Sequence, residues 1–69
     1  LEAGSDGLDI YRKLVPQAHE HLVEGGLFIV EIGSKQGQSV AQLFTDAGFK
    51  NVRVLNDYAS LPRNVVGIR

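Results

Sequence analysis

Cysteine is absent from the 69 residues of this chain. The chain therefore has no disulfide framework, no thiolate metal site and no cysteine nucleophile, and this lack fits a cytoplasmic protein. No apolar run approaches the roughly 20 residues that a membrane helix needs, and the start shows no basic region followed by an apolar one. The sequence thus predicts a cytoplasmic protein that does not enter a membrane.

An excess of one charge is also absent. Seven basic residues stand against eight acidic ones, which gives a net charge of −1, and the charges are scattered, which argues against binding to nucleic acid or a membrane surface. A hydrophobic content of 43% is typical of a globular protein. At this length we expect at most one domain, and because the first residue is Leu1 we expect the chain to begin inside a longer one.

A first helix is predicted at about residues 7–23. Asp6 is expected to cap its start, and Asp9 in the first turn suits the helix dipole. Pro16 predicts a kink or a restart near Val15, because proline removes one backbone hydrogen bond. Apolar residues recur at three- and four-residue spacing on one face: Leu8, Tyr11, Val15, Ala18 and Leu22, with Leu14 widening the stripe.

A strand and a second helix follow. The pair Gly25-Gly26 is expected to end the first helix. Residues 27–32 are rich in branched and aromatic side chains, which predicts a central strand buried on both faces. A second helix is predicted at about residues 36–47, with Gly48 as its C-cap. Its apolar positions match helical spacing: Val40, Leu43, Phe44 and Ala47.

The rest of the chain predicts two further strands and a partial α/β domain. Residues 51–57 alternate as a strand does, residues 59–64 contain proline and should form a loop, and residues 65–68 should form a short last strand. Strands joined by a helix are normally parallel, whereas those joined by a short loop are antiparallel neighbours. We therefore expect two helices on a mixed three-stranded sheet. Because a doubly wound sheet normally has more strands, residues 1–69 should be a single partial domain.

Several short segments occur in an order and spacing that point to a family. They are Asp6-Gly7-Leu8-Asp9-Ile10-Tyr11-Arg12, Leu22 with Gly25-Gly26, Glu31-Ile32-Gly33 with Gln36-Gly37, Ala47-Gly48-Phe49, and Arg63-Asn64-Val65-Val66-Gly67-Ile68-Arg69. Together they resemble the C-terminal part of HemK/PrmC-type protein-(glutamine-N5) methyltransferases. The match spans nearly the whole chain.

The resemblance implies a class I, Rossmann-like methyltransferase fold, whose seven-stranded sheet ends in an antiparallel strand slotted beside the fifth. Residues 27–32, 51–57 and 65–68 would be the fifth, sixth and seventh strands, with the last between the other two. Members of the family transfer a methyl group from S-adenosylmethionine to the side-chain amide of the glutamine in the Gly-Gly-Gln motif of peptide-chain release factors, in translation termination. The resemblance thus implies a protein methyltransferase with a release factor as its partner.

The groups that carry this chemistry in the family do not occur in the sequence. They are a glycine-rich turn after the first strand, an acidic residue at the cofactor ribose and an Asn-Pro-Pro-Tyr motif. A cofactor needs several such groups at once to offset the freedom it loses on binding. We therefore expect no catalytic set, cofactor site or metal site within the chain, and we expect the isolated chain to be inactive and to bind no S-adenosylmethionine.

Glu31 is the one candidate site residue. Ligands of open α/β sheets bind beyond the carboxyl ends of the strands, and Glu31 lies at that end of the predicted strand 27–32, beside the turn Gly33–Gln36. It could line the substrate cleft of an intact enzyme. Alternatively, its carboxylate accepts hydrogen bonds from the turn or pairs with a nearby Arg or Lys, and this is the interpretation we favour.

Three other motifs have simpler explanations than a site. His19-Glu20-His21 would point its imidazoles about 200° apart on a helix, unlike the i, i+4 spacing of helical zinc sites. Gln36-Gly37-Gln38 could mimic a Gly-Gly-Gln substrate, but helix-surface polarity is the simpler explanation. Tyr11-Arg12-Lys13 and Lys35 do not form a basic patch with interleaved aromatics. We expect all of them to be surface groups.

Two other functions stay open. A methyltransferase that acts on nucleic acid or a small molecule would have a similar C-terminal half, and only the missing upstream motif would separate it from a protein methyltransferase. The chain could also be a non-catalytic interaction module. Folding behaviour would distinguish that case, because a natural module should be a monomer, whereas half a sheet should expose a cut edge and associate.

Overall fold

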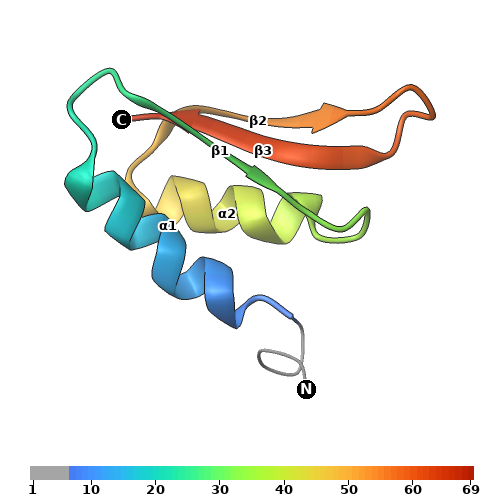
Figure 1. The fold of residues 1–69 in the computed structure, drawn as a ribbon, viewed down its shortest axis with the longest axis horizontal. Coiled ribbons are helices and arrows are strands. Elements are labelled where there is room, and N and C mark those ends of the chain that lie inside the picture. The colour runs from blue at the N-terminus through green and yellow to red at the C-terminus, as the bar shows by residue number, and fades with distance from the viewer. Residues whose placement is uncertain (1–6) are drawn as a thin grey trace.

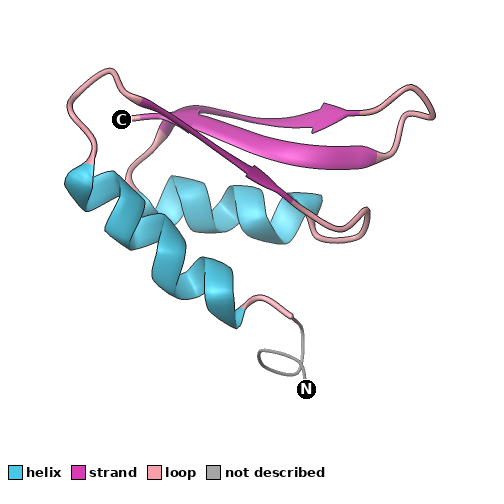
Figure 2. Cartoon of the chain, in the orientation of Figure 1, coloured by secondary structure: helices cyan, strands magenta, loops and turns pink. Residues whose placement is uncertain are grey.

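The computed structural model describes residues 7–69 as two layers, one of helices and one of strands (Figure 1). In chain order the elements are α1 (Asp9–His21), β1 (Leu27–Glu31), α2 (Gly37–Ala47), β2 (Lys50–Asn56) and β3 (Pro62–Ile68). Both helices lie against the same face of the sheet (Figure 2). The predicted order of elements is therefore confirmed.

The three strands lie in the order β1-β3-β2. The last strand thus sits between the other two, as predicted, and it is antiparallel to both: Val65 of β3 faces Val30 of β1 and Val54 of β2. β1 and β2 consequently run in the same direction without pairing with each other. The sheet is mixed because β1 and β2 are parallel to each other, although both hydrogen-bonded strand pairs, β1–β3 and β2–β3, are antiparallel.

Three aromatic rings hold the two layers together. Phe28 of β1 stacks on Phe44 of α2 at 5.6 Å between ring centroids and on Phe49 at 5.9 Å. Phe44 and Phe49 lie 5.0 Å apart. Phe44 has no exposed surface, like Val15 of α1 and Val40 of α2. Gly48 caps α2 in the left-handed conformation, as predicted, and turns the chain so that Phe49 enters this core.

The first helix departs from its prediction at both ends and at one position of its apolar face. Its N-cap is Leu8, without a side-chain cap, whereas the predicted cap, Asp6, lies outside the described residues. The helix runs through Pro16 without a restart, and Pro16 faces solvent. It also ends at His21, before the glycine pair. Leu14 is 40% exposed and does not widen the apolar stripe.

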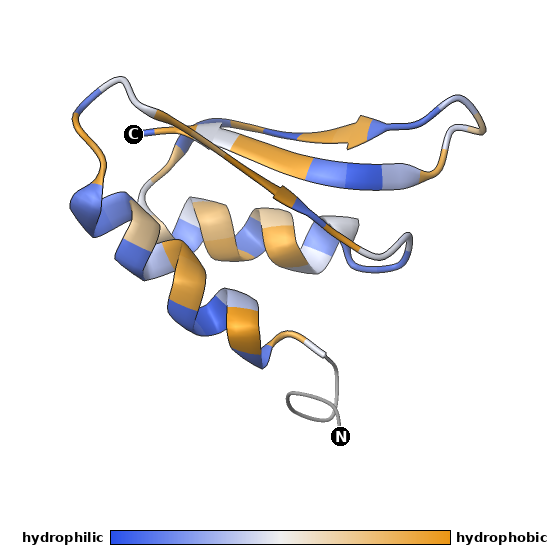
Figure 3. Cartoon of the chain, in the orientation of Figure 1, coloured by the Kyte–Doolittle hydropathy of each residue, from blue (hydrophilic) through white to orange (hydrophobic). Residues whose placement is uncertain are grey.

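β1 is buried on one face only within residues 7–69, so the prediction of burial on both faces is wrong for this part of the chain. Val30 is buried, but Leu27 is 58% exposed and Ile29 48%. Side chains alternate between the two faces of a strand, and within residues 7–69 both helices lie against one face of the sheet (Figure 1). Val30 is on that face, since it belongs to the buried cluster that contains Val15 and Phe44. The strand is apolar along its length up to Glu31 (Figure 3), so its other face is apolar and uncovered.

The hairpin between β2 and β3 is tighter than predicted. β3 begins at Pro62, within the segment expected to be a loop, because the carboxylate of Asp57 organises the turn. It accepts hydrogen bonds from the backbone N–H groups of Leu61 at 3.1 Å and Ala59 at 2.9 Å, and from Arg63 Nε at 3.0 Å. Proline is tolerated as the first residue of a strand.

These hydrogen bonds make the hairpin sensitive to acid. The backbone N–H of Leu61, the N–H of Ala59 and the Arg63 guanidinium together hold the pKa of Asp57 below its ordinary value of 3.8. A carboxyl group whose pKa is lower in the folded chain stabilises the fold above its unfolded pKa, and this contribution disappears as the pH falls through the folded pKa. The free energy of unfolding should therefore fall as the pH decreases below about 4, and we expect this fall to be smaller in Asp57→Asn than in the unsubstituted chain.

Urea unfolding at pH values between about 2 and 7 measures this effect. Asp46→Asn is the matched control, since the Asp46 carboxylate accepts one hydrogen bond from Gln42 Nε2 on the same helix face. An equal acid slope in the Asp57 variant and the parent chain would contradict the prediction.

Candidate functional site

The carboxyl end of β1 is where a ligand of this sheet would bind, since ligands of open α/β sheets bind beyond the carboxyl ends of the parallel strands. β1 ends at Glu31 and β2 at Asn56, and because both strands run the same way they end on the same side of the sheet. Glu31 shares the uncovered face with Ile29 and is exposed. Its position at the strand end is as predicted.

The carboxylate of Glu31 has no hydrogen bond or ion pair within residues 7–69. The favoured interpretation, in which the turn or a nearby Arg or Lys satisfies this group, is therefore not supported by the described contacts. The backbone of Glu31 is held instead. The Tyr11 hydroxyl of α1 donates a hydrogen bond to the Glu31 carbonyl oxygen at 2.7 Å.

Tyr11 therefore fixes the end of β1 to α1 and is half-buried, so its assignment to the helix surface was wrong. Its position among the apolar residues that recur at helical spacing in the first helix had indicated that the Tyr11 side chain faces the core. No sequence pattern indicated its acceptor, which lies 20 residues away along the chain.

Gln36 closes the turn that follows β1. Its side-chain oxygen accepts a hydrogen bond from the Gly33 N–H at 2.9 Å, and its side-chain nitrogen donates to the Gly7 carbonyl at 3.4 Å. The Gln36 N–H in turn donates to the Gly33 carbonyl at 3.0 Å. Gln36 thus ties this turn to the segment before α1, and its assignment as surface polarity was wrong.

These contacts do not form a site for a nucleotide-like cofactor. An anion- or phosphate-binding turn offers unpaired backbone N–H groups to its ligand, whereas the N–H groups of Gly33 and Gln36 are already bonded within the turn. This turn therefore has no free N–H of Gly33 or Gln36 to donate to the carboxylate of S-adenosylmethionine.

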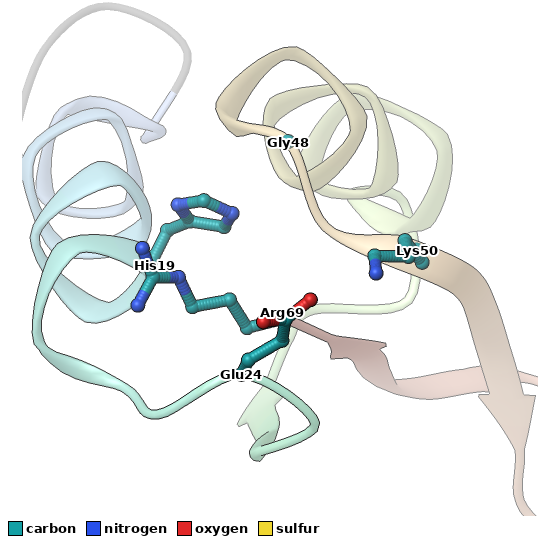
Figure 4. Close-up of a pocket in the computed structure, with 5 residues that line it drawn as sticks. All are labelled: His19, Glu24, Gly48, Lys50 and Arg69. Atoms are coloured by element: carbon teal, nitrogen blue, oxygen red, sulfur yellow. The ribbon is translucent and has the colours of Figure 1, made fainter.

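A hollow of about 330 Å³ lies at the opposite end of the sheet (Figure 4). It is lined by His19, Glu24, Gly48, Lys50 and Arg69. Two of these side chains have structural roles. Arg69 donates a hydrogen bond to the Leu22 carbonyl at the end of α1, and His19 packs edge-on against Phe49 at 5.0 Å between ring centroids. This hollow adjoins the amino ends of β1 and β2, away from the strand ends at Glu31 and Asn56.

The two histidines of the first helix do not converge. His19 packs inward, which corrects its prediction as a surface group, whereas His21 Nδ1 lies 2.9 Å from the Gln17 carbonyl one turn back. Within residues 7–69 no three His, Cys, Asp or Glu side chains are grouped as metal ligands would be.

The strand order and the comparisons with known proteins agree. A reversed last strand between two parallel ones is the arrangement that the resemblance to class I methyltransferases implied. No protein-family model matches the chain. Over its whole length, however, the chain is similar to proteins named release factor glutamine methyltransferase: it is 45% identical over 69 residues to the one from Caulobacter vibrioides and 47% identical over 70 residues to the one from Moorella thermoacetica.

A third relative of the same name, from Geobacter sulfurreducens, is 42% identical over 67 residues, or 97% of this chain. The chain spans about a quarter of the length of these relatives, 24%, 25% and 24%. The resemblance to the HemK/PrmC-type methyltransferases is thereby confirmed for the part of these relatives that the chain matches. Neither α1 nor α2, the helices within residues 7–69, has the length and apolar character that crossing a membrane would require.

Proposed function

We propose that this chain is the C-terminal part, a single partial domain, of an enzyme that methylates the glutamine side-chain amide of peptide-chain release factors, with S-adenosylmethionine as the methyl donor. The observation that carries the proposal is the identity of 45% and 47% over the whole chain to two proteins named for that activity. A release factor acts at the ribosome, so the enzyme would work in the cytoplasm.

Within that enzyme the chain supplies an edge of the sheet and the carboxyl end of β1. Its own residues hold this end in place through Tyr11 and Gln36, while the cofactor and the acceptor glutamine bind mainly to parts of the enzyme that precede this segment. We therefore propose that the isolated chain transfers no methyl group. This division agrees with the hydrogen-bonded turn after β1, which has no N–H group of Gly33 or Gln36 left to offer.

The test is methyl transfer by the intact protein that contains this segment. Labelled S-adenosylmethionine is incubated with a peptide-chain release factor and, separately, with a release factor in which the glutamine of the Gly-Gly-Gln motif is alanine. Label in the first and none in the second is expected, and the 69-residue chain alone should give none with either. Transfer to transfer RNA, DNA or a small molecule, with none to the release factor, would reject the proposal.

Glu31 is proposed to line the acceptor side of the cleft in the intact enzyme. Its exposed carboxylate stands at the ligand-binding end of β1 and has no partner within residues 7–69. A hydrogen bond to a charged group is worth about 1.5–3 kcal/mol, so we expect Glu31→Gln to lower kcat/KM by about 10-fold or more.

Steady-state kinetics with the release factor as the varied substrate measure the effect of this change. Glu24→Gln is the matched control, because Glu24 lines the hollow at the other end of the sheet, and it should leave kcat/KM unchanged. Equal kinetics for the Glu31 variant and the unsubstituted enzyme would remove Glu31 from the site without affecting the proposed reaction.

A further inference from the structure

The side-chain amide of Gln36 uses both of its ends. Its oxygen accepts a hydrogen bond from the Gly33 N–H at 2.9 Å, and its nitrogen donates one to the Gly7 carbonyl oxygen at 3.4 Å. Glutamine offers an acceptor and a donor at the same distance from the backbone, whereas an ionised glutamate of the same length offers acceptors only. The two partners of Gln36 therefore require a carboxamide and not a carboxylate.

Both partners of Gln36 are glycines, which lets its amide lie directly against the backbone. A Cβ atom at Gly7 would lie 3.3 Å from Gln36 Nε2, and a Cβ atom at Gly33 would lie 3.4 Å from Gln36 Oε1. Gly7 also has φ 72°, a left-handed conformation that residues with a side chain rarely adopt. Gln36 itself is half-buried. All three residues of this contact thus have the size and conformation that it needs.

The contact joins two segments that meet at the carboxyl end of β1. Gly7 directly precedes Leu8, the N-cap of α1, whereas Gln36 is the N-cap of α2 and ends the turn that follows β1. The first turn of α1 lies beside the end of β1, because the Tyr11 hydroxyl reaches the Glu31 carbonyl oxygen at 2.7 Å. The chain therefore enters α1 next to the strand end that carries Glu31.

We propose that Gln36 is a positioning residue for methyl transfer: its hydrogen bond to Gly7 fixes the end of β1 relative to the part of the enzyme that precedes this segment. This inference rests on the proposed function, in which the preceding part binds the cofactor and Glu31 lines the acceptor side of the cleft. Without the bond the strand end shifts against that part, and small misplacements of reacting groups lower the rate. The affinity for the cofactor should not change, because its groups lie in the preceding part.

Gln36→Glu removes one hydrogen bond of the contact and keeps the other. One carboxylate oxygen still accepts from the Gly33 N–H, but the second oxygen faces the Gly7 carbonyl oxygen and cannot donate to it. In the intact protein that contains this segment, we expect kcat with saturating release factor to fall by about 5-fold or more. The KM for S-adenosylmethionine should change by less than about 2-fold, whereas a general loss of structure would alter both constants.

Two further variants complete this experiment. Gln38→Glu is the matched control, since it places the same charge on an exposed residue in the first turn of α2, and it should leave kcat unchanged. Gly7→Ala breaks the contact from its other side, because the new Cβ atom crowds Gln36 Nε2. If the contact acts as one unit, kcat of the double variant Gly7→Ala, Gln36→Glu should be no lower than that of the slower single variant.

Hydrogen exchange of the intact protein, followed by mass spectrometry, tests the contact without methyl transfer. In Gln36→Glu the peptide that covers the first turn of α1, where the Arg12 N–H donates to the Leu8 carbonyl, should exchange faster than in the unsubstituted protein and in Gln38→Glu. Equal exchange, an unchanged kcat in Gln36→Glu, or losses in kcat that multiply in the double variant would overturn the proposal. An unsubstituted protein that labels no release factor would instead reject the proposed function, so the two failures are distinguishable.

Discussion

Phe44→Ala is expected to unfold most of the isolated chain. Phe44 is fully buried between α2 and the sheet, and its ring lies 5.6 Å from that of Phe28 and 5.0 Å from that of Phe49, centroid to centroid. Truncating a buried phenylalanine costs about 3–5 kcal/mol, whereas a chain of this length has a total stability of roughly 3–10 kcal/mol. Urea unfolding followed by circular dichroism measures the loss.

Two variants control for this result. Phe44→Leu keeps most of the buried volume and is expected to cost about 1–2 kcal/mol. Leu43→Ala changes the neighbouring residue, which is half-buried and lies outside the core cluster, and it should cost less than Phe44→Ala by about 2 kcal/mol or more. If Phe44→Ala unfolded at the same urea concentration as Leu43→Ala, the aromatic cluster would not be the main stabilising contact.

The order and type of the elements could be predicted because they depend on local pattern. Val40, Phe44 and Ala47 recur with the period of a helix, and Gly48 supplies the left-handed cap that ends it. The place of β3 between the other strands followed from the short connection to β2 and from the resemblance to a known fold. In the structure β3 lies between β1 and β2, as predicted.

What the sequence could not provide depends on contacts between distant residues. The exposure of Leu27 and Ile29 depends on what covers the second face of the sheet, and a central and an uncovered strand can have the same apolar composition. The start of β3 at Pro62 depends on the side chain of Asp57, five residues earlier, whose hydrogen bonds shorten the loop.

One feature of the candidate site could be predicted from the sequence, whereas the contacts that hold it in place could not. The position of Glu31 at the end of β1 followed from a general rule about strand ends. The groups that hold this end did not, since Tyr11 reaches Glu31 across 20 residues and Gln36 reaches Gly7 across 29. Tyrosine and glutamine occur widely on helix surfaces, and only the packing of α1 beside β1 gives these two side chains their acceptors.

Gly67→Ala is the second large effect that we expect, and it arises from excess volume rather than from lost volume. Gly67 lies in the central strand β3 opposite Phe28. A Cβ atom at this position would lie 2.8 Å from Phe44 Cδ2 and 2.9 Å from Phe49 Cβ. Overpacking of a core costs about 1–3 kcal/mol, and we expect the upper part of this range because Phe49 Cβ is attached to the backbone and cannot rotate away.

The double variant Gly67→Ala, Phe44→Leu separates this clash from any general intolerance of alanine in β3. A leucine at position 44 removes the ring atom nearest to the new methyl group. The double variant should therefore lose less free energy of unfolding, measured in urea, than Gly67→Ala and Phe44→Leu lose together as single variants. We expect the difference to be about 0.5–1 kcal/mol. Strict additivity would mean that the ring of Phe44 is not what excludes a side chain at position 67. Phe49, whose Cβ and Cγ would lie 2.9 Å and 3.2 Å from the new Cβ atom, would then be the obstacle.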